Sequence, residues 1–240
     1  MPALRADPFA PPQPQGFAIR AMGNALPLQG LTVLAVEDSR YACEALRLMC
    51  RRAGARLRRA ETLHAARAHL RVYRPDVVII DLGLPDGRGE ALIRDLVLST
   101  GRPSLILGTS GNPNGRASAL ASGADGFLDK PLESLPHFCA SILSHLPGFA
   151  GALPKDDPIT PDRLALHDDL AQAVRALHGA QDDAARRYVT GFIAGLARHS
   201  HDADLATAAE TAGQSAAGLP GLRAMLADRL AESAGCVPGL

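Results

Sequence analysis

Apolar and polar positions alternate in two distinct ways along the chain. Between residues 31 and 146, short apolar runs are separated by stretches in which apolar residues recur with helical periodicity. Such alternation is typical of βαβ units, which assemble into a parallel sheet. The expected strands are 32–36, 56–60, 77–80, 104–107 and 126–128, and the expected helices are 40–53, 63–73, 89–99, 116–122 and 132–145. We therefore predict an α/β fold with a doubly wound five-stranded parallel sheet.

The two ends of this region are marked by changes in composition. Residues 1–30 are rich in Pro, Ala, Gly and Gln, which favours a mobile leader. Residues 147–161 contain four prolines and interrupt the periodicity, so we interpret them as a linker. Beyond the linker only helical patterns occur, at 161–177, 182–199, 202–217 and 220–233. Their short loops favour a small all-α helical bundle, so residues 162–240 are expected to form a second domain.

The distribution of charge separates the two domains and limits their partners. The whole chain has 25 basic and 25 acidic residues and a formal net charge of zero. Residues 1–150 contain 17 Lys/Arg and 13 Asp/Glu, a net charge of +4, whereas residues 151–240 contain 8 and 12, a net charge of −4. Because binding to nucleic acid requires a basic surface, we expect no nucleic-acid partner for the acidic bundle.

Cysteine spacing and apolar run lengths limit the class of protein further. The four cysteines form no CxxC pair, so neither a disulfide framework nor a zinc site is indicated. No apolar run approaches the roughly 20 residues that a membrane span requires. The chain also lacks a charged start followed by an apolar signal core. We therefore expect a cytoplasmic protein without a membrane partner.

Polar residues that can carry chemistry follow the expected strands. Open α/β sheets bind their ligands at the carboxyl ends of the strands, and in a parallel sheet these ends lie at one edge. Three acidic residues share that edge and would repel one another without a compensating cation. A hard divalent cation such as Mg²⁺ suits such oxygen ligands. The residues concerned are Glu37 and Asp38 after the first strand, Asp81 after the third, Thr109 and Ser110 after the fourth, and Lys130 after the fifth.

This arrangement is suited to phosphoryl transfer onto a carboxylate. With a metal ion and the Lys130 ammonium nearby, the negative charge on the oxygens of a transferring phosphoryl group can be neutralised. A hydroxyl of the fourth strand can donate a hydrogen bond to one of those oxygens. Asp81, at the end of a central strand, is the expected acceptor.

Four segments carry a resemblance to a known family. VLAVEDS, VVIIDLGLPDGRG, LILGTSG and ASGADGFLDKP resemble the signature blocks of response-regulator receiver domains of two-component systems, which have a flavodoxin-like fold. The resemblance covers residues 31–146, and Gly83 stands where the family usually has a bulky residue. It implies that Asp81 is the phosphoacceptor, that Glu37, Asp38, Asp81 and the Gly83 backbone carbonyl hold Mg²⁺, that Thr109, or alternatively Ser110, is the switch hydroxyl, and that Phe127 and Lys130 are the switch aromatic residue and the lysine of the site.

The bundle carries a weaker resemblance. LATAAETAGQSAAGLPGL is similar to the core of a histidine-phosphotransfer domain, with Glu210 in the place of the reactive histidine. A carboxylate there lacks the imidazole nucleophile, so such a domain would be degenerate. An unrelated Ala-rich bundle explains the pattern equally well. The histidines of this region, which are His145, His167, His178, His199 and His201, are expected at the surface or at helix ends.

Together these features predict a response regulator that is not an enzyme acting on a separate substrate. A histidine kinase or phosphotransfer protein is the expected donor, and Mg²⁺ is the expected cofactor. The helical output domain is expected to bind a protein partner or to form a homodimer. Two alternatives stay open, a phosphorelay intermediate with a working phosphotransfer bundle and an atypical transcription regulator.

Overall fold

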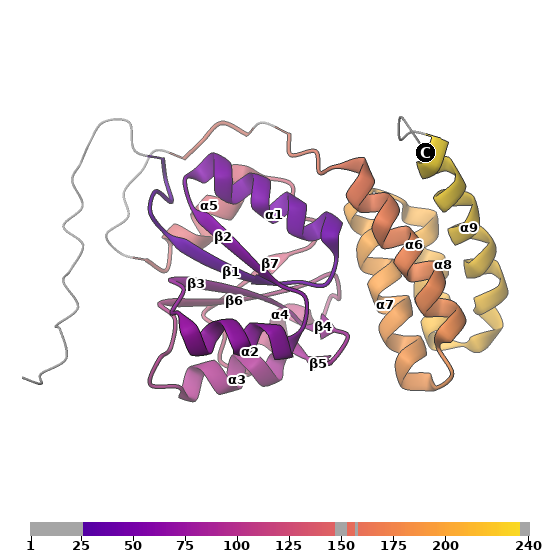
Figure 1. The fold of residues 1–240 in the computed structure, drawn as a ribbon, viewed down its shortest axis with the longest axis horizontal. Coiled ribbons are helices and arrows are strands. Elements are labelled where there is room, and N and C mark those ends of the chain that lie inside the picture. Colours follow the sequence, from indigo (N-terminus) through magenta and orange to yellow (C-terminus); the bar gives the residue numbers. More distant parts are fainter. Residues whose placement is uncertain (1–25, 147–152, 157, 236–240) are drawn as a thin grey trace, which may run out of the picture.

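The computed structural model describes residues 26–146, 153–156 and 158–235, and it contains the predicted parallel sheet (Figure 1). All neighbouring strands of the five-stranded sheet run parallel, in the order β2-β1-β3-β6-β7. The predicted α/β class and doubly wound topology are therefore confirmed. The strands are β1 (Thr32–Val36), β2 (Arg56–Ala60), β3 (Val77–Asp81), β6 (Leu105–Ser110) and β7 (Gly126–Asp129).

Helices cover both faces of the sheet and bury a separate apolar core on each face. One core joins β1, β3 and β6 to helices α1 (Arg40–Ala53) and α5 (Leu135–Leu143). The other joins the same strands to α2 (Leu63–Val72), α3 (Gly89–Leu98) and α4 (Gly115–Ala121). Figure 1 shows these two layers above and below the sheet. A strand that is buried on both faces lies in a rigid position, so the residues at its end are held firmly.

Short polar side chains set the starts of two of these helices. The Ser39 hydroxyl accepts a hydrogen bond from the Ala42 backbone N–H at 3.0 Å, and the Thr62 hydroxyl accepts one from the Ala65 N–H at 3.0 Å. Each bond satisfies one N–H group that has no acceptor within its own helix. A two-stranded hairpin, β4 (Gly83–Leu84) with β5 (Gly87–Arg88), follows β3 and was not predicted.

The second domain is helical, as predicted. It consists of α6 (Arg163–Gly179), α7 (Asp183–His199), α8 (Ala203–Gln214), a short 3₁₀ helix η1 (Ala216–Gly218) and α9 (Leu219–Gly235). Its core is made of Leu, Ile, Val and Ala side chains from α6 to α9. The helix that we expected over 202–217 ends at Gln214, because Ser215 is extended and its hydroxyl accepts a hydrogen bond from the Ala217 N–H.

The predicted leader is too long at its C-terminal end. Residues 1–25 lie outside the described residues, but Leu28 is fully buried in the core between the sheet and α1. The Leu28 N–H also donates a hydrogen bond to the Ala53 carbonyl oxygen at 2.8 Å. The short segment around Leu28, ALPLQG, has no helical or strand periodicity and contains Pro and Gly, which is why composition assigned it to the leader.

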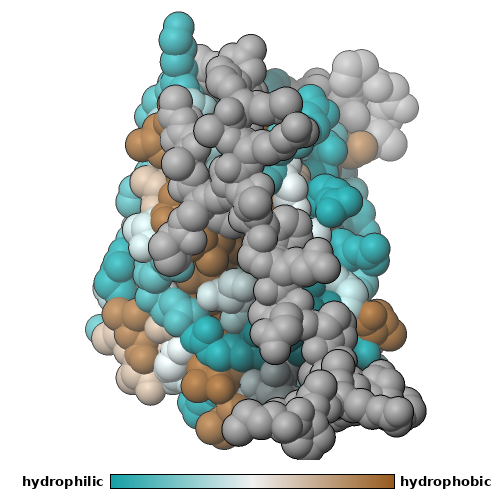
Figure 2. Space-filling view, turned by 90° about the vertical axis from the view of Figure 1, so that its left-hand side faces the viewer, coloured by the Kyte–Doolittle hydropathy of each residue, from teal (hydrophilic) through white to brown (hydrophobic). Residues whose placement is uncertain are grey.

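The predicted linker lies partly outside the described residues, which omit 147–152 and 157. In its described part, 153–156 and 158–161 form no helix or strand, and Ile159 packs against the core on the α1 side. The described chain contains no helix that is both long and apolar enough to cross a membrane. The end of the α/β domain that faces away from the bundle shows apolar residues in small groups between polar ones (Figure 2).

Candidate functional site

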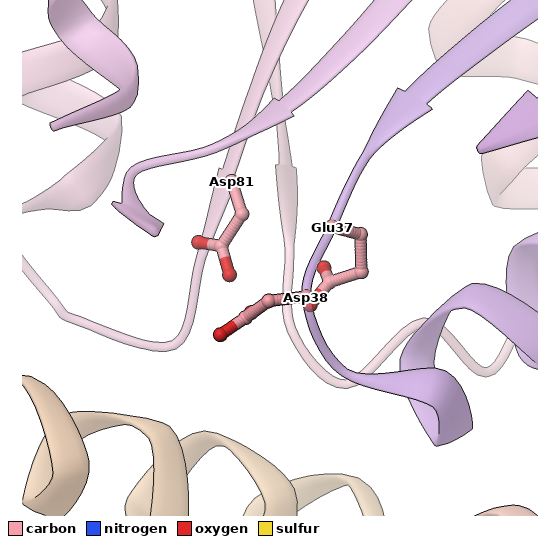
Figure 3. Close-up of side chains that lie close together, drawn as sticks. All are labelled: Glu37, Asp38 and Asp81. Carbon is pink, nitrogen blue, oxygen red and sulfur yellow. The ribbon is translucent and has the colours of Figure 1, made fainter. Parts of the chain in front are cut away.

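Three buried carboxylates meet at the carboxyl edge of the sheet (Figure 3). Glu37 and Asp38 directly follow β1, and Asp81 is the last residue of the adjacent β3. One carboxylate oxygen from each residue lies within 4.8 Å of the others. The residues are only 1%, 6% and 8% exposed. The sheet topology therefore brings together the three acidic residues that the sequence placed at strand ends.

Lys130 supplies a positive charge to this cluster. It follows β7, and its Nζ donates a hydrogen bond to Asp81 Oδ2 at 2.7 Å. The same Nζ lies 2.6 Å from Glu37 Oε2, and the lysine side chain is only 6% exposed. One ammonium cannot balance three neighbouring carboxylates, so the cluster favours a further cation or the protonation of one acid.

The pKa values of the cluster reflect this imbalance. Burial, followed by repulsion from Glu37 and Asp81, raises the pKa of Asp38 to about 7. Burial also raises the pKa of Asp81, although Lys130 opposes that shift. Burial alone would lower the pKa of Lys130, but the paired carboxylates override it and raise this pKa. Buried, partly uncompensated oxygen ligands of this kind fit a hard divalent cation.

Thr109 lies beside the predicted acceptor. In the pairing of β3 with β6, Thr109 is the register partner of Asp81, and it is 1% exposed. Its hydroxyl oxygen is buried and has no hydrogen-bond partner among the described residues. The neighbouring Ser110 hydroxyl instead accepts a hydrogen bond from the Asn112 N–H at 3.1 Å, within the loop that follows β6. Thr109 is therefore the hydroxyl that lacks a partner at this point of the sheet.

Phe127 lies under α4, one strand farther from Asp81. It is 6% exposed, and the Arg116 guanidinium lies over its ring, 5.2 Å from the centroid. Its register partner is Gly108, where an added Cβ would come within 2.5 Å of the Ala119 Cβ. The close contact between α4 and β6 therefore requires a glycine at this position.

Gly83 forms the start of the hairpin that follows Asp81. Its N–H donates a hydrogen bond to Asp81 Oδ1 at 3.1 Å, so the hairpin orients the carboxylate. A Cβ added at Gly83 would meet no atom within 4 Å in the described part of the chain. The site therefore has open space where the family usually has a bulky side chain. The metal-binding role of the Gly83 carbonyl stays a prediction.

The bundle contributes residues to this site that sequence reasoning missed. The Tyr188 hydroxyl, from α7, donates a hydrogen bond to Asp38 Oδ2 at 2.5 Å. From α6, Asp169 accepts a hydrogen bond from the Ser39 hydroxyl at 2.8 Å. These partners lie 150 and 130 positions apart in the sequence. Neither Tyr188 nor Asp169 belongs to a motif, so no sequence signal could have found them.

Glu210, the residue expected in place of the reactive histidine, makes no direct contact with the acid cluster among the interactions of the described residues. Glu210 is exposed on α8 and forms an ion pair with Arg198 of α7. His199 lies at the end of α7 as expected, but it is buried rather than at the surface. Burial and the nearby Lys130 lower the pKa of His199 to about 4, so its imidazole is neutral near pH 7.

Comparisons with known proteins agree with the features of the α/β domain. The family model for the response regulator receiver domain matches residues 33–139. The KDP operon transcriptional regulatory protein KdpE of Escherichia coli is 38% identical over 99 residues, which cover 41% of this chain and 44% of that protein. The virulence transcriptional regulatory protein PhoP of Salmonella typhimurium is 34% identical over 102 residues, covering 42% and 46%. The chain thus spans less than half the length of these relatives.

Solved receiver structures resemble the same part of the chain. A response regulator receiver domain from Methylobacillus flagellatus is 27% identical, with a TM-score of 0.42, and the match covers 50% of this chain and 98% of that one. The receiver domain of the sensor histidine kinase PA1611 from Pseudomonas aeruginosa, solved with a magnesium ion coordinated in its active site cleft, is 26% identical. Its TM-score is 0.39, and the match covers 42% of this chain and 86% of that one.

Residues 33–139 are a response regulator receiver domain of two-component signalling. The predicted family resemblance of the α/β domain is thereby confirmed. The bundle, α6 to α9, lies outside the matched residues, so its resemblance to a histidine-phosphotransfer domain stays a prediction.

Proposed function

We propose that this protein is a response regulator whose Asp81 accepts a phosphoryl group from a phosphohistidine of a histidine kinase or phosphotransfer protein. The observation that carries the proposal is the buried cluster of three carboxylates with one lysine at the carboxyl edge of the sheet. A purely structural ion pair rarely gathers three buried carboxylates around a single ammonium. A site that handles phosphoryl oxygens and a divalent cation explains this excess of negative charge.

Each residue of the receiver site has its own role in the proposed phosphoryl transfer. An Asp81 oxygen forms the new bond to phosphorus while the bond between phosphorus and the donor imidazole nitrogen breaks. The Lys130 ammonium, already 2.7 Å from Asp81, neutralises charge on the phosphoryl oxygens. The free Thr109 hydroxyl donates a hydrogen bond to one of these oxygens, and Phe127 then changes its packing beneath α4. In this proposal Thr109, not Ser110, is the switch hydroxyl.

Mg²⁺ fits the chemistry of this donor set. Glu37, Asp38 and Asp81, with the Gly83 carbonyl, would hold it. When bound, the ion neutralises the carboxylates and the phosphoryl oxygens together. The receiver assists its own phosphorylation and dephosphorylation in this proposal and acts on no separate substrate.

For the bundle, we propose a role in contacts with protein rather than in phosphate transfer. If the bundle is aligned with a histidine-phosphotransfer core, Glu210 takes the place of the reactive histidine, and this carboxylate is paired with Arg198. The negative charge of residues 151–240 disfavours DNA as a partner. A working phosphotransfer bundle would instead acquire an acid-labile, base-stable label on one of its histidines.

The test is labelling of the full chain with acetyl phosphate and Mg²⁺, followed by mass spectrometry. The wild-type protein should gain one phosphoryl group on Asp81, and Asp81→Asn should gain none, because the amide is a poor nucleophile. Asp95→Asn is the matched control, since Asp95 is an exposed carboxylate paired with Arg67 outside the site. Calorimetry should also show that Mg²⁺ binding is lost in a Glu37→Ala, Asp38→Ala double variant. Equal labelling of Asp81→Asn and wild type would refute the proposal.

A further inference from the structure

The bundle lies directly over the receiver's acid cluster. Figure 3 shows the ribbon of the bundle next to the three carboxylates. The bundle contacts several elements around the cluster, because α7 packs against both α1 and β4. Arg198 of α7 lies against Gly111, where an added Cβ would come within 2.7 Å of the guanidinium. His201 Nε2 lies 3.5 Å from Glu133, in the loop after β7.

Asp169 fixes α6 to the start of α1. It is completely buried, and its carboxylate accepts hydrogen bonds from the Ser39 hydroxyl and from the N–H groups of Arg40 and Tyr41, at 2.8, 3.1 and 3.0 Å. The first N–H groups of a helix have no acceptor within the helix, so this carboxylate supplies acceptors that α1 lacks. The α1 side chain of Tyr41 also packs against the apolar core of the bundle.

Tyr188 engages a carboxylate that a metal ion needs. Its hydroxyl donates a hydrogen bond to Asp38 Oδ2 at 2.5 Å. Mg²⁺ demands near-octahedral oxygen ligands and usually keeps several water molecules. A helix above the cluster and a hydroxyl on Asp38 both oppose that hydration shell.

While the bundle is docked in this way, it obstructs the approach of a protein donor to Asp81. Transfer from a phosphohistidine requires the reacting atoms to approach within about 3–3.5 Å. A donor domain would therefore have to occupy the space in which α6 and α7 lie.

We propose that α6 and α7 form an intramolecular lid on the phosphorylation site, fixed by Asp169 and Tyr188, and that binding of Mg²⁺ and phosphorylation of Asp81 release it. The inference rests on the proposed function of Asp81. Because the lid and the metal ion compete for the same crevice, each must weaken the binding of the other by the same factor. Release would expose the α7 surface and uncover the receiver at the same time.

The amide N–H groups of Arg40 and Tyr41 report directly on the lid. Their protection from hydrogen exchange depends on Asp169, so exchange should be slow in the metal-free full chain. Adding Mg²⁺ with beryllium fluoride, a mimic of the phosphoryl group, should speed their exchange about tenfold or more. The Ala65 N–H, which bonds to Thr62 within the receiver, is the internal control and should not change.

Two variants remove the lid contacts in different ways. Tyr188→Phe deletes only the hydroxyl, and Asp169→Asn replaces an acceptor oxygen with an NH₂ group. Calorimetry in the absence of beryllium fluoride should show Mg²⁺ binding about tenfold tighter in Tyr188→Phe, the factor expected for a lost hydrogen bond to a charged group. Thr207→Ala is the matched control, because Thr207 is exposed on α8 and bonds only to its own helix.

The outcomes separate the lid from the proposed function. Faster exchange at Arg40 and Tyr41 on addition of Mg²⁺ and beryllium fluoride, with tighter Mg²⁺ binding in Tyr188→Phe, would support the lid. Unchanged exchange in a protein that calorimetry shows to be loaded with Mg²⁺, or wild-type Mg²⁺ affinity in Tyr188→Phe, would overturn it. If instead Asp81 takes no label from acetyl phosphate in either wild type or Asp169→Asn, the proposed function fails, whatever the exchange rates show.

Discussion

Replacing Asp38 by asparagine should stabilise the metal-free protein. The pKa of Asp38 rises from 3.8 to about 7 on folding, chiefly because the carboxylate is buried and lies beside Glu37 and Asp81. A shift of about three units corresponds to roughly 4 kcal/mol at 1.36 kcal/mol per unit, an upper bound for a cluster that titrates together. Asparagine carries no charge, and its carbonyl oxygen can still accept the hydrogen bond from Tyr188. We expect a gain of about 2–4 kcal/mol in the free energy of unfolding at about pH 8.

The raised pKa of Asp38 also determines how the stability of the protein changes with pH. Because the folded pKa of Asp38 lies above the unfolded pKa, the folded state binds more protons between about pH 4 and pH 7. The stability of the wild-type protein should therefore fall as the pH rises through that window. Below about pH 4 the aspartic acid is neutral in both states, so the advantage of Asp38→Asn should disappear there.

Urea denaturation in EDTA, followed by circular dichroism at a series of pH values, measures the effect. The matched control is Asp76→Asn, since Asp76 Oδ2 accepts hydrogen bonds from the Thr32 N–H and hydroxyl, both at 2.7 Å. That variant should lose about 1–3 kcal/mol. An Asp38→Asn protein that is less stable than wild type at about pH 8, or whose advantage persists unchanged at about pH 4, would refute the electrostatic reasoning.

Two further substitutions test the packing that positions the site. Leu28→Ala should lower the free energy of unfolding by about 2–4 kcal/mol in chemical denaturation, because Leu28 is fully buried. A change below about 0.5 kcal/mol would show that residues 26–30 do not contribute to the folded α/β domain, as predicted from the sequence. Gly89→Ala should lower it by about 3 kcal/mol or more and weaken Mg²⁺ binding, because its Cβ would lie 2.1 Å from the Asp81 carbonyl oxygen. Wild-type stability in Gly89→Ala would contradict the close approach of Gly89, at the start of α3, to the Asp81 carbonyl oxygen.

The central strands β1, β3 and β6 could be predicted because each contains a short apolar run that is buried between the two helical layers. The exception is the end of β6, which we expected at residue 107 but which continues to Ser110. Gly108, Thr109 and Ser110 lack the apolar character that identifies a buried strand. They belong to the strand because Gly108 allows α4 and Phe127 to approach it closely. Function and close packing, rather than strand propensity, set the residues at this position.

The acid cluster could be predicted for a geometric reason. Parallel strands end at one edge of a sheet, so Glu37, Asp38 and Asp81 had to converge once the strands were located. Lys130 reaches the cluster from β7 across the width of β6. Distances, burial and pKa shifts could not be predicted, since they depend on how the bundle covers the crevice.

The docking of the bundle left no trace in the sequence pattern because its contacts with the receiver are largely polar. Asp168 and Asp169 resemble solvated charges on a helix, yet one pairs with Arg40 and the other is completely buried against α1. A purely apolar interface would have shown a second apolar stripe on α6 or α7. Such an interface would also have been difficult to separate in water. Hydrogen bonds to Asp169 and Tyr188 can instead be exchanged for bonds to water at a small net change in free energy. The polar contacts that left no apolar stripe in the sequence are therefore also the contacts that allow the lid to be released.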